Sequence, residues 1–394
     1  MDFASSKDEQ ALRDRFDALC RERIAPRARD VDLRGAIPKS SFRDLAEGGY
    51  FQLFHPSYLG GAGASGARMG HAMESLARAC PSTFWAATIS TVLCGKILHE
   101  LCAPAHHWAH LQPIVAGEKT GCFAATEDGA GSDPASYQTT LRETPDGVRL
   151  SGVKSRISNA GTADVAVVLA RDATPRGPGL CYLVVDLRRR GVERAEQPKM
   201  GLLGMSWGTL TFRDVPIAKA DVIANASIDR TLRAVEWGQL LQTWCAIGIA
   251  QALIDLCVEY TSNRVAFGRP IAHLEVVHGR LAELSAEVMA SRLLALDVTS
   301  IKARGEPTGD RVMIAKVRST ELSVRVADAA MRTFGGWGFS KAHAVERLYR
   351  DSLSNVPAGL PTDRLRELIG CAMVGADPWS YPAFDWLEEA GLRI

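Results

Sequence analysis

Five short blocks in this sequence combine residue types that can bind and transform a ligand. Arginine side chains pair with anionic oxygens, hydroxyl groups both donate and accept hydrogen bonds, and glycine turns let the backbone approach a bound molecule. Taken singly, each block has an ordinary structural explanation: the glycines after Phe334 would break a helix, and Arg264 would be a solvated helix residue. Their order and spacing are more informative. The blocks are Thr126-Glu127-Asp128-Gly129-Ala130-Gly131-Ser132-Asp133, Gly152-Val153-Lys154-Ser155-Arg156-Ile157-Ser158-Asn159-Ala160-Gly161, Arg264-Val265-Ala266-Phe267-Gly268, Phe334-Gly335-Gly336-Trp337-Gly338-Phe339 and Tyr349-Arg350-Asp351.

In this order and at these distances, the blocks resemble the acyl-CoA dehydrogenase family, and the resemblance spans nearly the whole chain. It implies an FAD enzyme that oxidises an acyl group held as a thioester on CoA or a carrier protein, with hydride transfer to flavin N5. It also implies an electron acceptor, either an electron-transfer flavoprotein or oxygen, and assembly as a homodimer or homotetramer.

The resemblance further implies which residues contact the flavin ring. Phe123, Ala125 and Thr126 match the segment that runs along the isoalloxazine, and Ser158 matches a hydroxyl that meets the flavin near N5. Ser132 matches a residue on the pantetheine side of the site, and we group it with the cofactor contacts. These residues form the first half of the expected site.

A second half of the expected FAD site comes from later in the chain. Arg264 and Phe267 match residues that reach the FAD of the adjacent subunit, where a guanidinium can pair with pyrophosphate oxygens. Gly335 and Gly336 match a glycine turn that lets the backbone approach the adenosine half. Arg332 replaces the usual glutamine and could supply an extra phosphate contact.

Arg156 departs from the family, whose members mostly carry tryptophan there, covering a face of the flavin. A planar guanidinium could stack on the ring and favour an anionic reduced flavin. It could also meet an acidic group of the substrate, or it could turn to solvent. The sequence leaves these three roles open.

The catalytic carboxylate of the family is missing. In most members a glutamate within a Tyr-Glu-Gly-Thr stretch takes the substrate α-proton, but the matching stretch here is Ala358-Gly359-Leu360-Pro361. A minority of relatives carry the base on the first long helix of the bundle, and that position is Gly238. A general base is worth roughly 10² to 10⁴ in rate, so its absence constrains the chemistry.

Two carboxylates lie near these glycines in the sequence. Glu236 precedes Gly238 by two residues and is our candidate base, although it could equally be a surface carboxylate beside Trp237. Asp363 follows Gly359, but with Thr362 it more readily caps the start of a helix.

Three functions are compatible with this pattern. The first is oxidation of a thioester-bound acyl group with a relocated or non-standard base, as in relatives from natural-product pathways that act on carrier-bound hydroxyacyl, aminoacyl or short acyl groups. The second is a flavin-dependent monooxygenase on the same fold, which needs no base at Cα. The third is a catalytically inactive flavoprotein that serves as a scaffold or electron carrier. We favour the first.

The composition limits the other classes of function. Lys plus Arg (46) nearly balance Asp plus Glu (45), so no overall charge would attract nucleic acid or an anionic membrane. The N-terminal residues lack the features of a signal peptide and no apolar run suggests a membrane span, which predicts a cytoplasmic protein. Nine scattered cysteines without paired spacing predict free core thiols and no metal site. His106, His107 and His110 are expected at a solvated helix end.

The hydrophobic periodicity predicts an α+β fold in three domains. We expect an all-α domain at residues 1–120, a small antiparallel β domain at 121–225, an antiparallel four-helix bundle at 226–376 and an aromatic tail at 377–394. Strands are predicted by β-branched runs that turn residues separate. These runs are Val148 to Leu150, Val165 to Ala170, Cys181 to Leu187 and Thr209 to Phe212.

Overall fold

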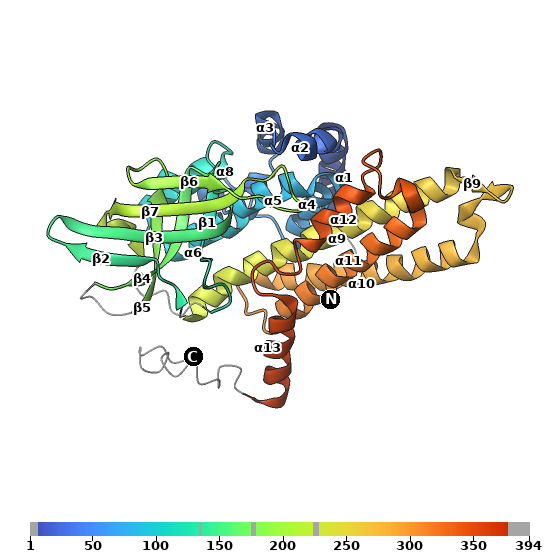
Figure 1. Cartoon of the computed structure of the whole chain (residues 1–394). Helices are drawn as coiled ribbons and strands as arrows, with labels where there is room; N and C mark the ends of the chain where they lie inside the picture. The colour runs from blue at the N-terminus through green and yellow to red at the C-terminus, as the bar shows by residue number, and fades with distance from the viewer. Residues whose placement is uncertain (1–6, 134–135, 175–178, 224–227, 377–394) are drawn as a thin grey trace.

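The structure is a computed structural model that describes residues 7–133, 136–174, 179–223 and 228–376. Helices come first, a β-sheet follows, and a group of long helices completes the described chain (Figure 1). The order α, β, α agrees with the sequence-based prediction. The predicted tail at 377–394 lies outside the described residues.

The N-terminal helices build one side of the helical core. The helix α5 (Pro81–Thr88) is buried along its whole length, and it begins at a proline, whose missing N–H has no intrahelical partner to lose at that position. Ser65 caps α4 (Gly66–Ala79), because its Oγ accepts a hydrogen bond from the N–H of Arg68 at 3.4 Å. The other helices are α1 (Lys7–Leu19), α2 (Ala28–Arg34), α3 (Lys39–Glu47), α6 (Gly95–Leu101), α7 (Pro104–His106) and α8 (Gln112–Val115), joined by the short 3-10 or π segments η1 (Cys20–Ile24), η2 (Ala25–Arg27), η3 (Phe51–Phe54), η4 (Ser57–Leu59), η5 (Ile89–Cys94) and η6 (His107–Leu111).

The central strands form one sheet in the order β6-β7-β3-β2-β4-β5-β8, with β1 beside β4. All four predicted strand runs fall in strands, apart from Leu187, which lies one residue beyond its strand. The sheet is mixed and not purely antiparallel as expected, because β1 and β2 each pair parallel to β4. Parallel pairing needs a long crossover, which local turn signals do not reveal. The strands are β1 (Gly121–Ala124), β2 (Thr140–Thr144), β3 (Gly147–Ser158), β4 (Val165–Asp172), β5 (Gly179–Asp186), β6 (Val192–Glu196), β7 (Trp207–Ile217) and β8 (Val222–Ile223), with η8 (Lys219–Asp221) before the last.

The C-terminal helices pack around one central helix, α9 (Ile228–Asn263). Trp244 on α9 is fully buried, and its Nε1–H donates to Oγ1 of Thr299 at 2.9 Å. Gly70 on α4 permits this packing, since a Cβ there would lie 2.5 Å from the Trp244 ring. The remaining elements are β9 (Val265–Ala266), β10 (Arg269–Pro270), η9 (Ile271–His273), α10 (Glu275–Ala303), α11 (Arg311–Phe334), η10 (Gly335–Trp337), α12 (Val345–Leu353) and α13 (Thr362–Val374).

One helix bears on the expectation that no apolar run suggests a membrane span. Residues Val235–Asn263 of α9 are long and apolar enough to cross a membrane. Within its most apolar window, 78% of the helix is buried inside the protein, as expected of a central core helix. The composition of α9 therefore follows from its position in the core.

The histidine prediction was wrong. His106 and His107 are 5% and 8% exposed, and Nε2 of His106 lies 3.2 Å from Oδ1 of Asp221. Asp221 is distant in the sequence, so the sequence did not identify it as the partner of His106.

All nine cysteines are free, as predicted. Among the described residues, no group of three or more His, Cys, Asp and Glu side chains could hold a metal ion.

Candidate functional site

The first set of predicted flavin contacts lies where β1 passes the end of β3. The N–H of Ser155 donates to the carbonyl of Thr126 at 2.9 Å, and Asn159 Nδ2 donates to the carbonyl of Gly121 at 3.2 Å. These bonds hold the two segments side by side. They bring together four predicted contacts, each half-buried, namely Phe123, Ala125, Thr126 and Ser158.

A buried lysine fixes the backbone of this segment. Lys154 Nζ donates to the carbonyl of Ala125 at 2.7 Å and to Oε1 of Glu127 at 2.8 Å. Burial lowers the pKa of Lys154 to about 8, although Glu127 opposes the shift. Burial acts to raise the pKa of Glu127, but the N–H of Gln138 and the Lys154 ammonium outweigh it and lower the pKa. The pair therefore holds Ala125 in place.

Arg156 is held against the turn that follows Thr126. Its Nη1 donates to Oδ1 of Asp128 at 2.9 Å, and its Nη2 donates to the carbonyl of Glu127 at 2.6 Å. Its backbone is left-handed, with φ +57°, which is uncommon for a residue with a side chain. Ser132, in the same turn, is half-buried. The Arg156 guanidinium is therefore paired with Asp128 and with the carbonyl of Glu127. Its stacking on a flavin stays a prediction.

The second set of predicted FAD contacts gathers at the far end of α9. Arg264 is exposed, and Phe267 is 92% exposed at the tip of the β9–β10 hairpin. The rings of Tyr260 and Phe334 stack with centroids 4.0 Å apart, so the ends of α9 and α11 are adjacent. The glycine turn that follows Phe334 therefore lies at the same end as the hairpin.

The backbone of this glycine turn is open. Gly335 has φ +58°, and a Cβ added to Gly335 or Gly336 would meet no atom within 4 Å. Arg332 is exposed, and its Nε donates to Oδ2 of Asp328 at 2.7 Å. The turn can therefore accept a ligand without displacing a side chain.

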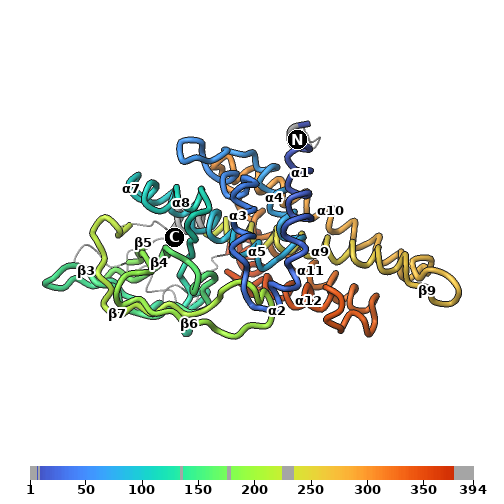
Figure 2. The backbone as a smooth tube through the Cα atoms, turned by 90° about the horizontal axis from the view of Figure 1, so that it is seen from above, coloured from blue at the N-terminus to red at the C-terminus, as the bar shows by residue number. Residues whose placement is uncertain are grey.

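The two sets of predicted FAD contacts lie at opposite ends of the molecule. Figures 1 and 2 show the β9–β10 hairpin projecting away from β1 and β3. The helix α9 runs between these ends, and its 36 residues span ~54 Å. Within one protomer, the predicted contacts do not converge on a single site.

The structure does not place Glu236 beside Gly238 or Gly359. Glu236 Oε2 accepts from Lys302 Nζ at 2.7 Å, and its Oε1 accepts from Thr308 Oγ1 at 2.9 Å. Two residues along a helix rotate the side chain by about 200°, so Glu236 and Gly238 point to opposite sides of α9. The role of Glu236 as the base stays a prediction, and this geometry argues against it.

Gly359 lies against a glutamine that the sequence analysis did not consider. A Cβ at Gly359 would sit 2.8 Å from Nε2 of Gln242, and the backbone there has φ +62°. Buried Lys316 secures the surrounding loop, donating to the carbonyls of Val356 (2.8 Å) and Leu360 (2.9 Å). The position that the family gives to a catalytic carboxylate therefore faces a carboxamide.

Asp363 does not compensate for the missing carboxylate. It is exposed, and Arg366 Nη1 donates to its Oδ1 at 3.0 Å. Thr362 and Asp363 are the first residues of α13, as predicted, but no side chain caps that helix.

Two tryptophans of α9 are core residues. Trp237 and Trp244 are 1% and 0% exposed. Trp237 also donates from Nε1 to Oε1 of Glu100 at 3.1 Å, and the Lys96 ammonium lies 4.9 Å from the centroid of its ring. Burial lowers the pKa of Lys96 to about 8.

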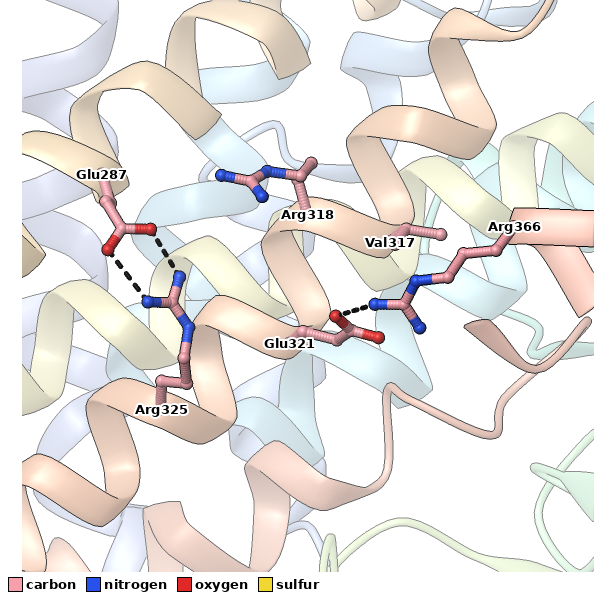
Figure 3. A pocket seen from close by; sticks show the side chains of 6 residues that line it. All are labelled: Glu287, Val317, Arg318, Glu321, Arg325 and Arg366. Carbon is pink, nitrogen blue, oxygen red and sulfur yellow. Dashed lines mark hydrogen bonds and ion pairs between the residues drawn. The ribbon is translucent and has the colours of Figure 1, made fainter. Parts of the chain in front are cut away.

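A separate pocket of about 360 Å³ lies between α10, α11 and α13 (Figure 3). Glu287 pairs with Arg325 and Glu321 pairs with Arg366, while Arg318 extends toward the same space. None of the residues that line it is a predicted FAD contact. This pocket is therefore distinct from the candidate site.

Comparisons with known proteins show the family to which the chain belongs. Three family models match consecutive parts of the chain, namely the acyl-CoA dehydrogenase N-terminal domain at residues 6–118, the middle domain at 122–215 and the C-terminal domain at 228–373. The chain is 30% identical to a 3-(aryl)acrylate reductase of Clostridium sporogenes over 84% of its own length and 89% of that protein. It is also 30% identical to the human mitochondrial short-chain specific acyl-CoA dehydrogenase, over 84% and 81% of the two chains.

The solved structures show the same fold. The butyryl-CoA dehydrogenase of Megasphaera elsdenii superposes with a TM-score of 0.90 at 25% identity, covering 95% of this chain and 100% of the other. The chain belongs to the acyl-CoA dehydrogenase family, whose members are FAD-dependent oxidoreductases. The open backbone at Gly335 and Gly336 and the half-buried Thr126 and Ser158 fit this cofactor.

Proposed function

We propose that this protein uses FAD to oxidise an acyl group held as a thioester on CoA or a carrier protein, without a carboxylate at position 359. The observation on which this proposal depends is the environment of Gly359. Its left-handed backbone would strain any side chain there, and a Cβ could be accommodated only if Gln242 moved. The oxidation therefore proceeds without the α-proton acceptor of most family members.

FAD, when bound, supplies the two-electron oxidant. The residues of the chain would hold and orient the reactants. Lys154 fixes the segment from Ala125 to Glu127, and half-buried Ser158 is the hydroxyl that we expect near the flavin. If the oxidised carbon bears an O–H or N–H group, the proton leaves from oxygen or nitrogen. A base at Cα is then not needed.

The pantetheine arm is common to CoA and carrier-protein thioesters. Ser132, half-buried in the turn after Glu127, is the residue we expect on the pantetheine side. This position supports a thioester substrate and is compatible with CoA and with a carrier protein. Thioesters of both kinds therefore belong in the test.

We further infer that the active form contains at least two copies of the chain. The two sets of predicted FAD contacts lie at opposite ends of one protomer, which supports a second copy that brings its hairpin to the flavin segment of the first. Exposed apolar side chains along the α9–α10 hairpin support an interface between copies. They are Val258, Val265, Val276, Met289 and Leu293.

Anaerobic mixing of the FAD-loaded protein with a panel of acyl-CoA and acyl-carrier thioesters tests the proposal through the flavin absorbance. Bleaching by one of them, without NADH, is the expected result and identifies the carrier. Electron-transfer flavoprotein and oxygen are then compared as acceptors. If no thioester bleaches the flavin, while NADH or a reductase does and oxygen then gives a hydroxylated product, the protein is a monooxygenase and the proposal is overturned.

A further inference from the structure

Gln242 occupies the space in front of Gly359. Its Nε2 lies 2.8 Å, and its Cδ and Oε1 lie 3.7 Å, from the position that a Cβ at residue 359 would take. No other atoms come as near to that position. Gln242 follows Gly238 by four residues, so both residues lie on the same face of α9. The carboxamide thus contacts one of the two positions at which the family places its base, and it shares a helix face with the other.

Gln242 is buried but not fully hydrogen-bonded. It is 4% exposed, and its Oε1 has no hydrogen-bond partner within the described part of the chain. A buried polar atom without a partner is costly, so such an atom beside a binding site points to a ligand that satisfies it.

The neighbouring residues on this face of α9 are also polar. Asn355, in the loop before Gly359, and Trp85 on α5 approach the Cys245 thiol closely enough to act as its hydrogen-bond donors. Cys245 lies about one turn beyond Gln242 on the same face of α9.

A carboxamide cannot act as the missing base. It is neutral at physiological pH, and it donates through nitrogen and accepts through oxygen. It can orient a substrate group that carries an O–H or N–H donor, and it disfavours a plain alkyl chain that would leave it unsatisfied.

We propose that Gln242 contacts the acyl part of the substrate and selects thioesters whose acyl group bears an O–H or N–H donor near the thioester. The proposal rests on the proposed function, because it places the acyl group of the thioester beside Gly359. Gln242 is then a specificity-determining residue.

Calorimetric binding of 2-hydroxybutyryl-, 3-hydroxybutyryl- and butyryl-CoA to the FAD-loaded protein tests this inference. We expect at least one hydroxyacyl thioester to bind roughly 10- to 100-fold more tightly than butyryl-CoA. In Gln242→Met we expect that ratio to approach one, through weaker hydroxyacyl binding. Gln242→Glu retains an acceptor and should retain the preference, which keeps the test valid if the methionine variant does not fold. Gln239→Met, at a buried glutamine on the same helix, is the matched control and should leave the ratio unchanged.

The outcomes separate this inference from the proposed function. Equal binding of all three thioesters by the unmodified protein, or an unchanged ratio in Gln242→Met, overturns the role of Gln242 even if a thioester bleaches the flavin. A ratio that depends on Gln242 supports the contact even if no thioester bleaches the flavin, in which case the proposed oxidation alone fails.

Discussion

The Nζ atom of Lys302 lies 2.7 Å from Oε2 of Glu236, and this ion pair joins α9 to the end of α10. The Lys302 side chain is 6% exposed and that of Glu236 is 17% exposed, so the pair is largely shielded from solvent. Thr308 donates to the other oxygen of the same carboxylate. The Glu236 carboxylate therefore has both oxygens hydrogen-bonded, and it links α9 to the end of α10 and the segment that follows.

Glu236→Gln is expected to affect stability more than flavin reduction. Loss of a charged hydrogen-bond acceptor opposite a shielded ammonium should lower the free energy of unfolding by about 1–3 kcal/mol. The rate of flavin reduction should fall less than about tenfold, below the usual worth of a general base. Urea denaturation and anaerobic stopped-flow absorbance measure the two effects. A hundredfold slower reduction at unchanged FAD content would instead identify Glu236 as the base.

Gly359→Glu should not restore the activity typical of the family. The new side chain would collide with Gln242 and would occupy a left-handed backbone position, which costs more than about 1 kcal/mol. We expect a lower unfolding midpoint and no gain in flavin reduction by alkyl thioesters.

The double variant Gly359→Glu with Gln242→Ala separates the two costs of that substitution. Part of the stability lost in Gly359→Glu should return, because the collision is removed while the strained backbone remains. Gly131→Ala is a matched control, since a Cβ there meets no atom within 4 Å and its φ is not positive. A stable Gly359→Glu single variant would contradict the observed contact.

Phe267→Asn tests whether the hairpin acts between protomers. Phe267 and Gly268 have φ of +53° and +77°, and asparagine suits such a turn better than phenylalanine does. The substitution should leave the fold intact or stabilise it, but it should lower FAD retention and favour dissociation. Light scattering and the ratio of flavin to protein absorbance measure these effects. Leu33→Gln, which removes an exposed apolar side chain elsewhere, should change neither.

Asp351 should make stability fall as the pH rises from about 4 to 6. Burial raises the pKa of its carboxyl from 3.8 to about 6, although the N–H of Leu202 donates to it and opposes the shift. Within this window the folded protein binds the proton that the unfolded chain has released. The stabilisation is complete below pH 4 and lost above pH 6.

Asp351→Asn removes this titration. The difference in unfolding midpoint between the original protein and the variant, measured from pH 4 to pH 7, should therefore decrease as the pH rises and level off above pH 6. A difference that does not change with pH would show that the carboxyl has an ordinary pKa in the folded protein.

Part of the site could have been read more closely from the sequence. At 100° of rotation per residue, Glu236 lies about 200° around the helix from Gly238, and Gln242 lies about 40° from it. Helix geometry alone therefore predicts that Gln242, and not Glu236, shares a helix face with Gly238. Other contacts had no sequence signal. Lys154 beside the carbonyl of Ala125 and Lys316 beside that of Leu360 join segments far apart in the chain.

The sequence by itself determined the elements, the family and the cofactor, because periodicity and the order of short blocks are local properties of the chain. It also showed that residue 359 carries no carboxylate. Only the tertiary structure decided that Gln242 faces Gly359, that Lys302 holds Glu236, and that the predicted FAD contacts divide between two ends of the molecule. These relationships depend on how distant elements pack, and packing is set by the shapes of all the side chains between them.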